Sequence, residues 1–249
     1  MPKQGLSTVY INIRLKHNHA FVVSHKFNIF HYLYKMKTIH AKFVDGIESM
    51  PETEIFRILD SETESNEINC VNWKEFPYAP DVKFHIAWSE KAVAVLFKVC
   101  EDYLRGTALE ANGPVWEDSC VEFFIADPFS EEYFNFETNC IGTKLASKRR
   151  SRTDADHFSP EMIDQIRSFG SLPHEVIDRQ GKGQSWWLVE VIPFSLIGLD
   201  KAPEKLSVNF YKCGDKCQKM HFLSWSEINL PEPNFHCPEF FGELILDTK

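Results

Sequence analysis

The feature that most constrains this chain is a two-residue alternation of apolar and polar side chains that begins at Val82. Residues of equal parity on a strand face the same side, so such an alternation places one apolar row against a core. The alternation runs over residues 82–88, stops at Ser-Glu-Lys, and resumes over residues 93–99. This pattern predicts a β-hairpin.

More strand-forming segments follow, each bounded by clusters of Gly, Pro, Asp or Asn. They cover residues 119–126, 133–139, 185–192, 206–212, 220–225 and 243–246. Many short strands separated by turn signals predict an all-β fold, specifically an antiparallel β-sandwich of immunoglobulin-like type.

One short helix is expected to decorate this sandwich. Ser159 and Pro160 are typical of a helix start, and Gly170 is typical of a helix end. The apolar residues between them, Met162, Ile166 and Phe169, share one helical face. We expect that face to pack on the core.

Charge is spread unevenly along the chain. The net charge is -9, which argues against a nucleic-acid partner, yet residues 1–44 are basic and contain no Asp or Glu. Residues 1–35 are therefore expected to be a basic N-terminal extension, and residues 36–249 a single domain. The extension either lies upstream of a natural start at Met36 or is a targeting segment or basic arm. No apolar run is long enough for a transmembrane helix, so no membrane span is expected.

The seven cysteines are scattered singly, apart from Cys213 and Cys217. An odd number in no tight framework favours reduced thiols. Reduced thiols suggest the cytoplasm, with the periplasm left open. Cys213, Cys217, His236 and Cys237 could suggest zinc, but the paired spacing of zinc ligands is missing and structural thiols are the commoner explanation.

Residues 114–124, PVWEDSCVEFF, place an indole and carboxylates beside a strand. On an extended strand Trp116 and Glu122 would share one face with Asp118 and Cys120, while Val121, Phe123 and Ile125 would face the core. An aromatic ring beside a carboxylate suits a sugar, which has an apolar C–H face and a rim of hydroxyls. Equally, Trp116 can cap the edge of the sandwich and Glu122 can pair with a lysine.

Motifs for catalysis are scarce. The sequence has no nucleophile elbow, no His-Glu-x-x-His, no phosphate-binding glycine loop and no dinucleotide fingerprint. Glu117 and Glu122 could in principle act as a glycosidase pair, but acidic β proteins commonly offer such pairs.

Four segments together resemble carbohydrate-binding module family 9, in the nearly free-standing form found in bacterial sugar degraders. They are WKEFPYAPDVKFHIAW (73–88), VWEDSCVEFFI (115–125) with YFNFETNCIG (133–142), WLVEVIPFSLIG (187–198), and VNFYKC, FLSWSEI and FHCPEFFGELIL within 208–246. The resemblance implies a β-sandwich of the DOMON-like group and non-catalytic binding of a mono- or oligosaccharide. The expected ligand is a terminal sugar of a plant-type polysaccharide such as xylan or cellulose.

The resemblance also implies roles for individual residues. In this family two tryptophans sandwich a sugar ring, and Trp116 and Trp225 match the pair. Glu122 matches the family's acidic acceptor for hydroxyls. Asn139 and Asn209 lie in segments that face the site. One departure is that Phe222-Leu223-Ser224 stands where some members carry amides, which leaves the preferred sugar open.

A cation is also expected at the site, supplied by Lys144 or by one of Arg149 and Arg150. The family carries structural calcium, although no oxygen-rich loop for it is evident in the sequence. Its members commonly accompany glycoside hydrolases, so association with such enzymes is expected. Two alternatives stay open: a glycoside-active enzyme, and a haem-binding electron-transfer domain in which Met220, His221 or His174 would ligate the iron.

Overall fold

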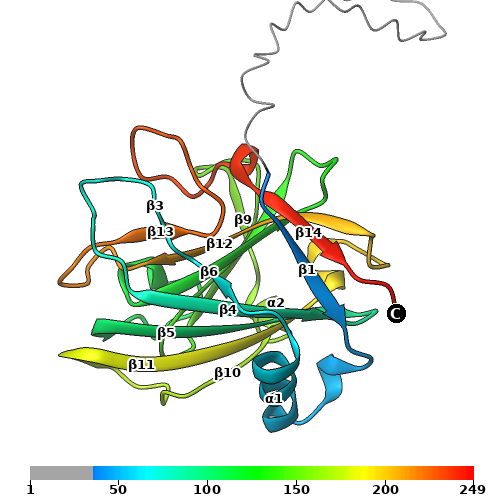
Figure 1. Ribbon diagram of the computed structural model, residues 1–249, viewed down its shortest axis with the longest axis horizontal. Coiled ribbons are helices and arrows are strands. Elements are labelled where there is room, and N and C mark those ends of the chain that lie inside the picture. The colour runs from blue at the N-terminus through cyan, green and yellow to red at the C-terminus, as the bar shows by residue number, and fades with distance from the viewer. Residues whose placement is uncertain (1–35) are drawn as a thin grey trace, which may run out of the picture. The chain divides into compact units, whose positions relative to one another are not determined.

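A computed structural model describes residues 36–249, which form two packed layers of β-strands (Figure 1). The predicted all-β sandwich is confirmed. The expected extension over residues 1–35, with its alternative start, lies outside the described residues and stays a prediction. No helix in the described part of the chain is long and apolar enough to cross a membrane.

The first layer contains the predicted hairpin. Its strands are β4 (Asp81–Trp88), β5 (Ala92–Gly106), β10 (Arg167–Gly170), β11 (Ile177–Pro193) and the short β2 (Asn66–Glu67). The order is β10-β11-β5-β4, with every pair antiparallel. The strand expected over residues 185–192 is part of the much longer β11.

The second layer carries the stretch PVWEDSCVEFF. Its strands are β6 (Cys120–Ala126), β7 (Tyr133–Asn139), β8 (Lys144–Arg149), β9 (Ala155–His157), β12 (Lys205–Cys213), β13 (Phe222–Ser224), β14 (Gly242–Leu246) and the short β3 (Cys70–Val71). The order is β14-β12-β6-β7-β8-β9, and β13 pairs with β12.

One strand joins the two layers. β1 (Thr38–Phe43) pairs parallel with β14 through its first part and parallel with β4 through Lys42 and Phe43. The sandwich is therefore not wholly antiparallel. This strand was not predicted from the sequence, because its alternation is short and lies within a basic segment.

Aromatic rings fill the space between the layers. The Phe210 ring of β12 stacks on Phe84 of β4 at a centroid distance of 3.9 Å and on Phe123 of β6 at 4.8 Å. All three side chains are fully buried. Outside the second layer, a smaller apolar cluster that includes Trp73, Phe124, Tyr133, Tyr211 and Phe235 underlies the loops.

The helices differ from the prediction. Helix α1 (Glu52–Glu62), which was not predicted, buries Ile55 and Leu59 against the first layer. The predicted helix begins as expected, with the Ser159 hydroxyl accepting from the backbone N–H of Met162, but α2 spans only Pro160–Ile163. Phe169 belongs instead to β10, because strand pairing with β11 and ring contact with Trp187 override the helical pattern.

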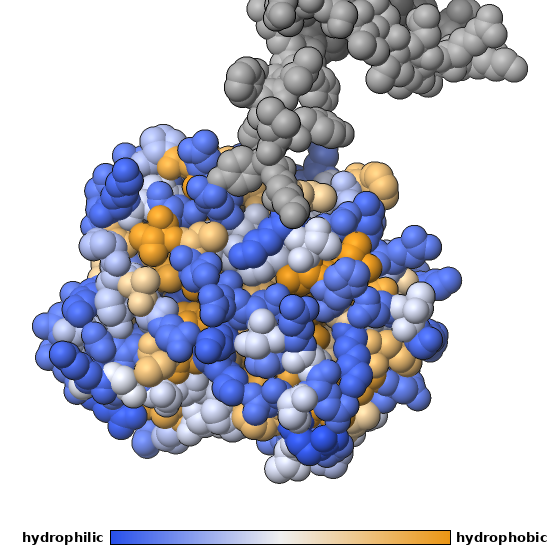
Figure 2. Space-filling view, in the orientation of Figure 1, coloured by the Kyte–Doolittle hydropathy of each residue, from blue (hydrophilic) through white to orange (hydrophobic). Residues whose placement is uncertain are grey.

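The remaining helical elements are single 3-10 turns. They are η2 (Ile47–Ser49), η3 (Val115–Glu117), η4 (Phe194–Ile197) and η5 (Pro238–Phe240). The face of the molecule seen in Figure 2 is mostly polar, with apolar residues in small separate groups. All seven cysteines lie in the described part of the chain and are unpaired. Their reduced state in the native protein stays a prediction.

Candidate functional site

Strand β6 divides its side chains between two environments. Val121, Phe123 and Ile125 lie in the core between the layers, whereas Cys120 and Glu122 face the loops outside the second layer. This is the division that the alternation predicted. Glu122 is paired across the sheet with Glu137 of β7 and, on the other side, with Tyr211 of β12.

A pocket of about 240 Å³ opens over this face. Its lining combines aromatic, acidic and basic side chains. They are Trp116, Glu122, Glu137, Arg149, Arg152, Cys213, Asp215, Phe222, Pro233, Asn234, Phe235 and His236. Ligand pockets are commonly about 300–1,000 Å³, so this one suits a small ligand or one end of a longer one.

Trp116 stands at the rim of the pocket on η3 rather than on the strand itself. Its side chain is 38% exposed. Its backbone carbonyl accepts from the N–H of Asp215 at 3.1 Å, and Lys216 pairs with Glu117 at 2.9 Å. The loop after β12 therefore fixes the turn that carries the indole.

Asp118 does not face the pocket. Its carboxylate accepts from the backbone N–H groups of Thr107 and Ala108 and lies 3.3 Å from the Arg105 guanidinium. The predicted strand face thus ends at Cys120, because η3 turns the chain before it. Asp118 anchors that turn.

Two buried carboxylates form the floor. Burial, together with the neighbouring Glu137, raises the pKa of Glu122 well above its usual range. Burial raises the pKa of Glu137 to about 7, although Arg149 and a hydrogen bond from Asn135 act in the opposite direction. Burial likewise raises the pKa of Asp215, at the side of the pocket, to about 6. Such groups are well placed to exchange hydrogen bonds with a polar ligand.

Arg149 supplies the buried positive charge. Its Nε donates to the Asn135 side-chain carbonyl at 2.8 Å, and Asn135 in turn donates to Glu137 at 2.7 Å. The guanidinium also donates to the backbone carbonyl of Arg152. Among the described residues Arg149 forms no ion pair, and it lines the pocket.

The loop before η5 supplies part of the pocket wall. The Phe235 ring stacks on Tyr211 at 4.2 Å, and His236 Nδ1 lies 3.0 Å from the Tyr133 hydroxyl. Burial, with Arg149 and Arg152 nearby, lowers the pKa of His236 to about 3. The imidazole is therefore neutral at physiological pH.

Trp225, the expected partner of Trp116, lies elsewhere. It is 1% exposed, and its ring packs edge-on against Phe210 at 5.8 Å in the core. The predicted tryptophan sandwich is wrong for this structure, because a ring enclosed in the core has no free face for a sugar. Strand alternation explains the difference: Leu223 and Trp225 face the core, and Phe222 faces the pocket.

The two predicted asparagines are fully buried and act within the protein. Asn139 donates to Asp118 and to the Ala108 carbonyl, and Asn209 bonds both the N–H and the carbonyl of Ser226. Neither lines the pocket. The prediction of direct ligand contact for them is not supported, since these bonds occupy their amides.

Of the three candidate cations, only Arg149 lines the pocket. Lys144 lies on the other face of β8 and donates to Ser168 and to the Ile166 carbonyl, beside a separate cavity of about 410 Å³. Arg150 is exposed and pairs with Glu132 and Asp154. Lys144 therefore does not line this pocket, since residues an odd number of positions apart on a strand, as Lys144 and Arg149 are, face opposite sides.

The alternative haem ligands do not converge. Both nitrogens of His221 are engaged, with Lys212 and the Lys219 carbonyl, whereas Met220 is exposed. His174 lies 3.0 Å from the Thr143 hydroxyl. In the grouping that could have suggested zinc, the Cys217 thiol contacts Ser119 and the Cys237 thiol donates to the Asn234 carbonyl, which agrees with structural thiols.

Several pocket residues were not predicted from the sequence: Glu137, Arg152, Asp215, Phe222 and the segment 233–236. The signal for Glu137 was present, since it shares parity with Asn139 on a predicted strand. Phe222 could have been found in the same way. The loop residues carry no periodic signal, and only the folded chain brings them to the pocket.

A comparison with known proteins identifies the family of this chain. The model of carbohydrate-binding family 9 matches residues 54–246. The chain therefore belongs to carbohydrate-binding family 9. A comparison with curated proteins finds none that matches this chain.

Solved structures agree with the family. A structure from Bacteroides uniformis, of a candidate carbohydrate-binding protein, is similar with a TM-score of 0.80 and 36% identity, covering 85% of this chain and 100% of that one. Family 9 modules from Caldicellulosiruptor kristjanssonii, with glucose and with cellotriose, give TM-scores of 0.52 and 0.56 at 15% identity. These matches cover 86% of this chain and 97% and 95% of those chains. At this identity they show the fold alone.

Proposed function

We propose that this protein binds the terminal ring of a mono- or oligosaccharide in the pocket around Trp116 and Glu122. The observation that carries the proposal is one half-exposed indole at the rim of a pocket whose floor holds buried carboxylates and a guanidinium. A pyranose stacks its apolar face on an aromatic ring and directs its hydroxyls to such polar groups. Trp116 supplies the ring, and Phe222 offers a second aromatic surface across the pocket.

In this proposal different polar groups of the pocket bind different oxygens of the sugar. Glu122 and Glu137 exchange hydrogen bonds with neighbouring hydroxyls, and Arg149 donates to an oxygen of the same ring. Asn135 fixes the positions of the Arg149 and Glu137 side chains, because it forms a hydrogen bond with each of them. Plant-type glucans and xylans supply ligands of this chemistry, and the relatives solved with glucose and cellotriose support testing those two sugars first.

Calorimetric titration of glucose, xylose and cellotriose into the full chain tests the proposal. Glu122→Gln keeps the shape of the side chain but replaces one carboxyl oxygen with an amide NH₂ group, which leaves a ligand hydrogen bond unmade, so affinity should fall by about 1–3 kcal/mol. Glu190→Gln is the matched control, since Glu190 is equally buried but lies outside the pocket, bonded to Thr138. Absence of binding by every sugar, or equal losses in both variants, would contradict the proposal.

A second candidate function rests on the same carboxylates. Glu122 and Glu137 are directly paired residues of neighbouring strands, which places their Cβ atoms about 4.5–5.5 Å apart. Raised pKa values in a carboxylate pair are a property of glycosidase acids. Release of reducing sugar from xylan or cellulose, abolished by Glu137→Gln, would favour an enzyme over a binding module.

The proposal also includes a partner class. A module that holds a chain end acts beside glycoside hydrolases that cleave the same polysaccharide. Recovery of such an enzyme with the native protein on a cellulose or xylan matrix, and its loss with the Trp116→Ala variant, would support this association. Recovery of the enzyme in equal amount with both forms would count against it.

A further inference from the structure

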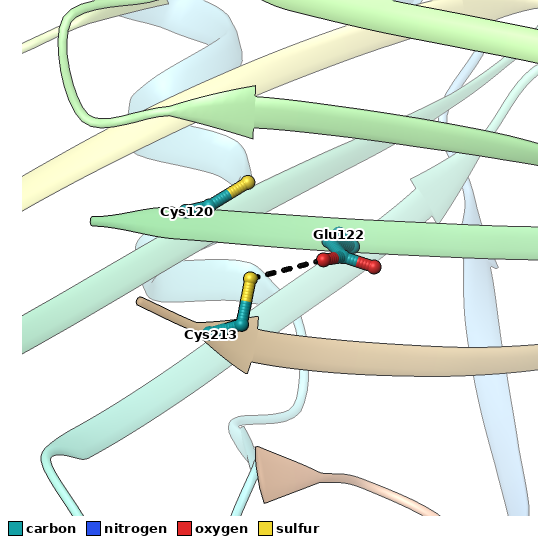
Figure 3. Close-up of side chains that lie close together, drawn as sticks. All are labelled: Cys120, Glu122 and Cys213. Carbon is teal, nitrogen blue, oxygen red and sulfur yellow. Dashed lines mark hydrogen bonds between the residues drawn. The ribbon is translucent and has the colours of Figure 1, made fainter. Parts of the chain in front are cut away.

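Three side chains with metal-ligating atoms meet on the inner side of the pocket (Figure 3). Cys120 and Cys213 are directly paired residues of β6 and β12, and Glu122 lies two residues along β6 on the same face. One ligand atom from each lies within 4.8 Å of the other two, and the Cys213 thiol donates to Glu122 Oε1 at 3.1 Å. In the part of the chain that the structure describes, this is the sole grouping of its kind.

We propose that Cys120, Cys213 and Glu122 form a binding site for a thiophilic divalent cation, with Zn²⁺ as the ion that best fits the donor set. Thiolates select soft and borderline metals, whereas Ca²⁺ and Mg²⁺ require six or more oxygen ligands. The grouping is distinct from the Cys213, Cys217, His236 and Cys237 set that the sequence suggested.

The separations are close to those of a tetrahedral site. Zn–S bonds of about 2.3 Å and Zn–O bonds of about 2.0–2.2 Å place ligand atoms about 3.6–3.8 Å apart. The present upper limit of 4.8 Å therefore requires changes of about 1 Å. Side-chain rotation can supply such a change without movement of the paired strands.

The surroundings leave one coordination position open. Glu122 and Cys213 line the pocket, whereas Cys120 has no exposed surface. An ion would therefore enter from the pocket and keep a water or a ligand atom on that side, as three-ligand zinc sites do. Two thiolates and one carboxylate around Zn²⁺ carry a net charge of −1, which the Arg149 guanidinium in the same pocket offsets.

One opposing effect limits the affinity. Burial raises the pKa of the Cys120 thiol to about 12 and that of the Cys213 thiol well above its usual range, and both thiol protons must leave when the metal binds. The cation site shares Glu122 with the proposed sugar site. A bound ion would therefore compete with a sugar for that carboxylate.

Titration of the reduced, chelator-treated full chain with Zn²⁺, against a chromophoric chelator, tests the proposal. One ion per chain is expected, and Co²⁺ should give a thiolate charge-transfer band in the near ultraviolet. Cys120→Ala and Cys213→Ala should each weaken Zn²⁺ binding more than about tenfold, because changes even to outer-shell partners have effects of that size. Cys140→Ala is the matched control: this thiol is also buried but donates to the Arg105 carbonyl.

Two measurements keep the outcome decisive. Trp116→Ala should retain Zn²⁺ binding whether or not it affects sugar binding, which separates this proposal from the proposed function. If a cysteine variant fails to fold, zinc-edge X-ray absorption of the parent decides, with two sulfur ligands expected. No ion bound, no sulfur ligands, or equal loss in Cys140→Ala would overturn the proposal.

Discussion

Trp116 and Trp225 were both expected to stack on a sugar ring, but in the structure Trp116 lies at the rim of the pocket and Trp225 is buried in the core. Trp225 continues the alternation of β13 into the core, where Phe84 and Phe210 meet its ring edge-on. Trp116 is held on a 3-10 turn by backbone bonds, so its ring stays half exposed. An indole ring that packs in the core stabilises the fold. An indole that is positioned by backbone hydrogen bonds can keep its ring accessible to a ligand.

The largest expected effect tests the buried member. Trp225→Ala should lower the free energy of unfolding by about 3–5 kcal/mol, because it leaves a cavity in the core. Denaturant unfolding followed by circular dichroism measures this loss. The folded fraction should still bind sugar. A change below about 1 kcal/mol, with sugar binding lost, would instead place Trp225 at the binding site.

Two of the three candidate cations, Arg149 and Lys144, sharpen the comparison between pocket and interior. Arg149→Met should weaken sugar binding by about 1.5–3 kcal/mol, since it removes charged hydrogen bonds. Lys144→Met should leave the affinity unchanged, because Lys144 lies on the other face of β8. Calorimetric titration of both variants checks this. The reverse ranking would mean that the sugar binds over the Lys144 cavity.

For the exposed member, the effect should appear in binding rather than in stability. Trp116→Ala should weaken sugar binding by about 1–3 kcal/mol through loss of stacking and apolar contact. Its free energy of unfolding should change by less than about 1 kcal/mol, since much of the ring is in solvent. Fluorescence titration and thermal melts measure the two quantities. Phe129→Ala, which removes a 93% exposed ring outside the pocket, is the control.

The smallest expected effect tests whether water reaches the His236 imidazole in the pocket wall. The pKa of His236 is lowered to about 3 in the folded protein. The unfolded chain therefore binds a proton at this residue below about pH 6.5, whereas the folded protein does not until the pH is much lower. The stability that this neutral imidazole contributes is complete above pH 6.5 and falls as the pH decreases. Between pH 7.5 and 5.5 the parent should lose about 1.4 kcal/mol more than His236→Gln. Equal pH slopes for the two proteins would show that water reaches the imidazole.

Strand periodicity accounts for what the sequence could predict. The alternation of β6 correctly separated Glu122 from Val121 and Phe123. Applied to residues 222–225, the same rule would have placed Phe222 at the pocket and Trp225 in the core. The resemblance to a family paired Trp225 with Trp116 instead, because position in a motif does not record which way a side chain faces.

Other features had no local signal. Asp215 and His236 reach the pocket on loops whose paths depend on contacts with η3 and with the Tyr133 ring. Helix α2 ends early because the residues that would continue it pair with β11 as strand β10. In both cases the deciding partner is distant in sequence. Periodicity within a segment could not report it.

Strand β1 has a consequence for the order of events in folding. It pairs Thr38 with Glu243, so the bridge between the two layers forms between the two ends of the described chain. Closing a loop of that length is entropically unfavourable and makes the contact late. During synthesis on the ribosome, β1 must wait for all the residues between it and β14 before this partner strand emerges. Until then the edges of β1 and β12 that pair with β14 stay open to pairing with other chains, which makes the nascent protein vulnerable to aggregation until β14 is made.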